Sequence, residues 1–153
     1  MKYQARLILT LLLVIAGTGL LSNAASAAEA AGVQVILVEA SNPSDGKGGV
    51  DPALREYAST LQRLFRFNSY KQLARRGIRM QVPGEGGTGL PGGQKLVLKA
   101  TEGGGSGLMA ELSWTRGGKR LLHTRIQLRP GQPAVLGGPR SNGGTHLLIL
   151  TLE

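Results

Sequence analysis

Residues 122–128, Leu-His-Thr-Arg-Ile-Gln-Leu, alternate a mostly apolar set of side chains with a polar set. Successive side chains of a β-strand point to opposite faces, so this pattern predicts a strand with one buried face and one solvent-exposed (wet) face. The same alternation recurs at 78–82, 95–100 and 110–115, and 146–152 forms a more apolar last strand.

Stretches that contain Gly or Pro separate these strands, and we expect each of them to be a turn. They are Gly84–Gly93, Gly103–Gly107, Gly117-Gly118, Pro130-Gly131 and Gly137–Gly144. Short connections favour antiparallel neighbours.

Two elements are expected nearer the N-terminus. Val33–Val38 (VQVILV) is short, apolar and rich in β-branched residues, which predicts a central strand. Asp51 and Pro52 predict the cap and first position of one helix near 51–65. Its apolar stripe comprises Leu54, Tyr57, Ala58, Leu61, Leu64 and Phe65, and its polar side Arg55, Glu56, Gln62 and Arg63. We expect Tyr57, Phe65, Phe67 and Tyr70 to pack the helix onto the sheet.

Together these elements predict an α+β fold that is mostly antiparallel sheet with one amphipathic helix. The pattern leaves open whether the strands form a β-meander or a small sandwich. We expect residues 28–153 to be a single β-rich domain, because a chain of this length forms one core.

Residues 1–27 have the organisation of a secretory signal peptide. Lys2 and Arg6 precede an apolar run from Leu7 to Leu21, and Ala25-Ser26-Ala27 supplies small residues before a cleavage site near Ala27. We therefore expect an exported protein, periplasmic or extracellular, that meets the membrane only if the signal stays uncleaved. Cleavage would lower the formal net charge from +9 to +7.

The chain has no cysteine, so no disulfide can form in an oxidising compartment. Apolar burial and sheet hydrogen bonds must then stabilise the fold.

Motifs of nucleotide enzymes are incomplete. Gly84–Gly89 matches G-x-G-x-x-G, but a strand is expected next where a dinucleotide site needs a helix. The loop Ser41–Gly49 contains Gly46-Lys47, yet it lacks both the first glycine and the Ser or Thr after the lysine that a P-loop requires. We expect no cofactor.

Hydrolase and metal chemistry have little support as well. Ser44 and Lys47 match S-x-x-K without the accompanying K-T-G strand. His123 and His146, the only histidines, fall on the polar and apolar faces of different strands and have no acidic neighbour in sequence. We expect no catalytic residue and no metal site, and a small hydrolase with a cryptic site stays an alternative.

A basic strand face is the candidate binding site. Lys95, Lys99, Arg125 and Arg129 are expected on one wet face, with Glu111 as a partial counter-charge. Such a face would attract an anionic polymer or lipid headgroup. Arg75, Arg76 and Arg79 form a second cluster. Stacking aromatics do not interleave with the cations, and Trp114 falls in the buried register, which argues against nucleic acid.

The stretch His123–Gly138, HTRIQLRPGQPAVLGG, resembles a strand–turn–strand pattern of bacterial secretin pore domains. In that pattern an alternating strand leads through a Gly-containing turn into an apolar strand that ends in Gly-Gly. The whole chain is similar to small exported bacterial proteins of unknown function. The resemblance implies a cell-envelope setting and no activity.

These observations favour a non-enzymatic binding or accessory protein of the bacterial cell envelope that contacts an envelope or secreted protein partner through its sheet. Binding of anionic envelope material through the basic face is the main alternative.

Overall fold

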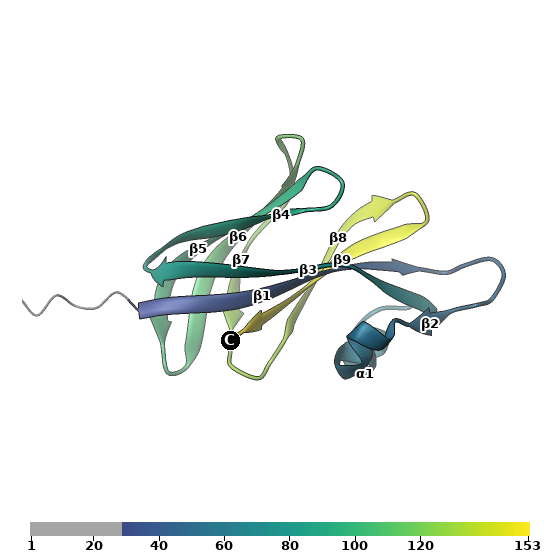
Figure 1. The fold of residues 1–153 in the computed structure, drawn as a ribbon, viewed down its shortest axis with the longest axis horizontal. Helices are drawn as coiled ribbons and strands as arrows, with labels where there is room; N and C mark the ends of the chain where they lie inside the picture. The colour runs from purple at the N-terminus through teal and green to yellow at the C-terminus, as the bar shows by residue number, and fades with distance from the viewer. Residues whose placement is uncertain (1–28) are drawn as a thin grey trace, which may run out of the picture.

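The computed structural model describes residues 29–153, most of which lie in β-strands (Figure 1). The predicted signal peptide, residues 1–27, lies outside the described residues. The β-rich class with one short helix is confirmed. The elements in chain order are β1 (Glu29–Ser41), β2 (Gly49–Val50), a 3-10 helix η1 (Pro52–Tyr57), α1 (Ala58–Leu64), β3 (Ser69–Val82), β4 (Gly84–Leu90), β5 (Gln94–Gly104), β6 (Gly107–Arg116), β7 (Lys119–Leu128), β8 (Ala134–Ser141) and β9 (Gly144–Leu152).

The strands form two sheets. Sheet A has the order β2-β3-β1-β9-β8, and sheet B has the order β4-β5-β6-β7. Every pairing is antiparallel except the short one between β2 and β3. Sheet B follows chain order, whereas sheet A places the first strand beside the last. β1 lies in the middle of sheet A, as predicted for Val33–Val38.

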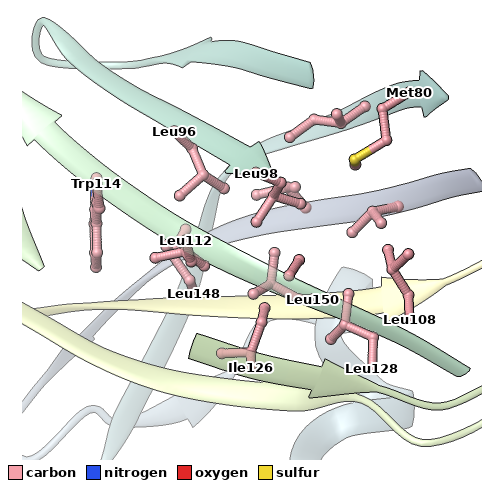
Figure 2. Packing of buried hydrophobic residues seen from close by; sticks show 14 of the residues in the cluster. Met80, Leu96, Leu98, Leu108, Leu112, Trp114, Ile126, Leu128, Leu148 and Leu150 are labelled. Atoms are coloured by element: carbon pink, nitrogen blue, oxygen red, sulfur yellow. The ribbon is translucent and has the colours of Figure 1, made fainter. Parts of the chain in front are cut away.

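The main core lies between the two sheets, whose inner faces pack against each other (Figure 2). Every second side chain along the strands is buried in this core, so the predicted apolar faces are confirmed. Its fully buried members include Val33, Val35, Leu37, Leu96, Leu98, Ala110, Leu112, Trp114, Leu128, Leu148 and Leu150.

A second core lies on the other face of sheet A, where η1 and α1 cover it. Leu54, Tyr57 and Leu61 are buried against β1, β3 and β9, and Tyr70 donates its hydroxyl to the Leu61 carbonyl at 3.2 Å. Asp51 caps the start of η1 by accepting from the Ala53 amide, as predicted.

The helix is shorter than predicted. It begins as a 3-10 turn and ends at Leu64, and Phe65 is already extended. Leu64 was expected in the buried stripe, but it is 54% exposed. Leu64 is the last residue of α1, and its side chain is not among those that pack on sheet A.

The predicted turns at Gly84–Gly93 and Gly137–Gly144 are wrong over most of their length. β4 occupies the first range, and β8 extends to Ser141 in the second. A Cβ added at Gly86 would lie 2.7 Å from Ile78 Cγ2, and one at Gly138 would overlap the Trp114 ring. These glycines permit close approach inside strands rather than turns. The Gly117-Gly118 turn is confirmed, since both residues have positive φ.

Candidate functional site

The four predicted binding residues are all exposed on the outer face of sheet B. Lys95 and Lys99 lie on β5, Arg125 lies on β7, and Arg129 follows the end of β7. Their alternate neighbours point into the core. The structure therefore places the four cations where the alternation predicted.

Acidic side chains interrupt this face. The strand register aligns Glu85, Lys99, Glu111 and Arg125 in one row across all four strands of sheet B, which we call the charge row. Arg125 Nη2 lies 3.4 Å from Glu111 Oε1. The signs alternate along the row, so the face is mixed rather than uniformly basic. The position of Glu85 in this row could not be predicted from the sequence, because Gly84–Gly93 was expected to be a turn.

The edges of the sheets differ in how they are protected against pairing with another strand. Bulges and charges discourage such pairing. The register shifts at two end strands, where β7 pairs with β6 and where β8 pairs with β9. It also shifts where β3, which lies next to the two-residue end strand β2, pairs with β1. β3 also carries Arg75, Arg76 and Arg79 in exposed positions.

β4 is an end strand of sheet B that has no register shift. Its seven residues pair with β5 without a register shift, from Gly84 opposite Ala100 to Leu90 opposite Gln94. Glu85 is its only charged residue, and a Cβ added at Gly89 would meet nothing within 4 Å. Among the end strands of the two sheets in residues 29–153, β4 therefore has the longest pairing that contains no register shift.

A buried polar network links the two sheets around His146. The Trp114 indole donates to Gln94 Oε1 at 2.9 Å, and Gln94 Nε2 lies 3.2 Å from His146 Nδ1. An indole N–H can only donate, so the amide oxygen must face it and the amide nitrogen must face the imidazole. His146 Nδ1 then accepts, and its Nε2 proton faces Glu39 Oε2 at 3.9 Å.

This network does not have the arrangement of a hydrolytic triad. Ser141 donates to Glu39 Oε2 at 3.4 Å, and no hydroxyl among the described residues hydrogen-bonds to His146. A serine nucleophile needs contact with the base that takes its proton. The sequence does not indicate that Glu39 and Gln94 lie near His146, because both are far from it along the chain. The pairing of β1 with β9 places Glu39 directly opposite His146.

Acidification should weaken the fold through His146. Burial lowers the pKa of His146 from 6.5, the Arg116 cation lowers it further, and Glu39 opposes them in part. The unfolded chain therefore takes up a proton before the folded one does, and stability should fall as pH drops through about 6.5 towards the lowered pKa. Urea midpoints measured across this range should decline for the parent. The decline should be smaller in His146→Gln and unchanged in His123→Gln, since His123 is exposed. Equal slopes in all three proteins would contradict this assignment.

A cavity of about 160 Å³ lies at the opposite end of β1 from this network. Its lining includes Ala31, Val82, Gly103, Leu108 and Leu152. Pockets for drug-sized ligands occupy about 300 Å³ or more, so this cavity is too small for one.

Two features are absent from residues 29–153. No three His, Asp or Glu side chains there gather closely enough to hold a metal ion. No helix in the same range is long and apolar enough to cross a membrane.

Comparisons with protein-family models, with curated proteins and with solved structures found no match to this chain. The secretin-like pattern at 123–138 stays a prediction. In the structure, its two strands, β7 and β8, belong to different sheets.

Proposed function

We propose that this chain is an exported, non-enzymatic binding or accessory protein of the bacterial cell envelope, and that a protein partner adds an extended segment to the β4 edge of sheet B. The observation that carries the proposal is the contrast between the end strands of the two sheets: β7 and β8 have register shifts, β2 is only two residues long, and β4 pairs over seven residues without a shift. The signal-peptide pattern at 1–27 supports export.

β4 could bind an added strand through the backbone groups that do not pair with β5. Main-chain hydrogen bonds supply affinity in this mode, and side chains on alternate positions supply specificity. Gly87 and Gly89 remove side chains from the outer face of β4, so an incoming strand could reach the β5 side chains behind them. The core shared by both sheets also leads us to propose that the fold is a small two-layer sandwich.

The two alternatives have less support. Glu85 and Glu111 lie among the cations of sheet B, which lowers the field available to an anionic polymer or lipid headgroup. A hydrolase would need a nucleophile beside His146, and Ser141 hydrogen-bonds to Glu39 instead.

A single cysteine can test the β4 contact, because the chain has none of its own. Gly89→Cys, carrying a photoactivatable cross-linker, should cross-link to a partner polypeptide in the exported fraction. Gly105→Cys is the matched control, since an added Cβ there also meets nothing within 4 Å but the position lies between β5 and β6. Mass spectrometry of the product should identify a peptide joined to residue 89.

Salt separates this proposal from its main alternative. Cross-linking that rests mainly on main-chain pairing should lose only part of its yield at moderate ionic strength, whereas binding that depends wholly on Lys95, Lys99, Arg125 and Arg129 should weaken steeply. Equal cross-linking from residues 89 and 105, or none from either, would contradict strand addition at β4.

A further inference from the structure

We propose that the strand added at β4 is β4 of a second copy of this chain, paired antiparallel about a two-fold axis at Gly87. This inference rests on the proposed function and names the partner. In this register Gly87 faces its own counterpart, and Glu85 of each copy faces Gly89 of the other. Sheet B would then continue into the second copy, as expected of a self-complementary two-fold interface.

Charge complementarity selects this register. Lys95 is the partner of Gly89 within sheet B, so it lies directly behind Gly89 as seen from an incoming strand. Gly89 has no side chain, and the space above it is open. Glu85 of one copy can therefore extend over Gly89 of the other and meet Lys95. Because of the two-fold axis, the interface contains two such Glu85–Lys95 pairs.

The charge row continues across the junction. Its signs run positive, negative, positive and negative from Arg125 through Glu111 and Lys99 to Glu85. In the paired register the next side chain is Lys95 of the second copy, which is positive. Opposite charges on neighbouring strands stabilise a sheet, and like charges destabilise it.

β3 contacts β4 but does not pair with it, so β4 stays an end strand of sheet B. β3 and β4 diverge from their junction at Pro83 (Figure 1). β3 approaches Gly86 on the inner face, where Ile78 and Met80 belong to the core. Glu85, Gly87 and Gly89 lie on the opposite, exposed face.

A mixed disulfide tests the register directly. Residues directly opposite in an antiparallel pair have Cα atoms about 4.5–5.5 Å apart, within the range a disulfide spans. Glu85→Cys and Gly89→Cys, mixed and exposed to oxygen, should form a linked dimer. Each variant alone should not, because its cysteine faces a residue that is not cysteine. Glu85→Cys mixed with Gly105→Cys is the control.

Charge exchange provides a second measurement that needs no cysteine. Glu85→Lys alone and Lys95→Glu alone should each weaken self-association in sedimentation equilibrium by about tenfold, since both symmetric pairs become repulsive. An equal mixture of the two variants restores both pairs and should recover the parent affinity. Lys119→Glu reverses a charge away from β4 and should leave association unchanged.

The outcomes separate this inference from the function on which it rests. A purified protein that stays monomeric, while residue 89 still cross-links to a different protein, would overturn the second copy and leave strand addition intact. A dimer that forms no mixed disulfide and does not respond to charge exchange would also overturn it. Loss of both self-association and the residue-89 cross-link would overturn both proposals.

Discussion

Trp114→Ala is expected to lower the free energy of unfolding by about 4 kcal/mol, because it opens a large cavity in the core between the sheets. Trp114 is fully buried, its ring covers Gly138, and its indole N–H donates to Gln94. The substitution removes this packing and leaves the Gln94 carbonyl without its donor. Urea unfolding followed by far-ultraviolet circular dichroism measures the effect, since no other tryptophan is available for fluorescence.

Trp114→Phe separates packing from hydrogen bonding. A phenyl ring retains much of the contact with Gly138 but cannot donate to Gln94, so we expect a smaller loss of about 1–2 kcal/mol. Similar losses for alanine and phenylalanine would show that the hydrogen bond, rather than ring volume, dominates at this position.

Gly107→Ala is expected to destabilise the fold by about 3 kcal/mol or more, because two costs coincide. Gly107 has φ of +128°, a conformation that residues with a Cβ rarely adopt. An added Cβ would also overlap the Leu128 carbonyl oxygen, which belongs to the backbone of β7 and cannot move independently. The urea midpoint should fall accordingly.

Gly105→Ala is the matched control in the same hairpin. An added Cβ there meets nothing within 4 Å, so we expect a change within about 1 kcal/mol. A comparable loss at both positions would mean that flexibility of the hairpin, and not the contact with Leu128, determines the effect.

Alternation along the strands predicted which side chains enter the main core. Leu96, Leu98, Leu112 and Trp114 are buried, and Lys95 and Lys99 are exposed. A strand has a period of two, so once one face is buried the pattern determines the orientation of every residue. The four candidate cations are exposed for the same reason, since each alternates with a buried residue.

The structural role of the glycines is the feature that the sequence predicts least well. Gly84–Gly93 and Gly137–Gly144 look like turns from composition alone, yet Gly86 and Gly138 lie in strands where another segment comes close. Whether a glycine serves a turn or a close approach depends on what packs against it. That neighbour lies in another strand at both positions, Ile78 of β3 for Gly86 and Trp114 of β6 for Gly138.

The candidate site was predictable only in part. Lys95 and Arg125 could be assigned to a wet face from their own strands, but the alternating charge row requires the register of β4, β5, β6 and β7 together. His146 and Glu39 likewise come together because β1 pairs with β9. Neither pair is close along the chain.

The sequence by itself determined the β-rich class, the buried faces of the main core and the absence of disulfides, because these follow from local periodicity and composition. Only the tertiary structure decided which strands are neighbours, which of them lie at an edge, and that β4 pairs without a register shift whereas the end strands β7 and β8 have one. Edge status depends on long-range pairing. Nothing in the residues of β4 itself indicates that, among residues 29–153, only β5 pairs with it.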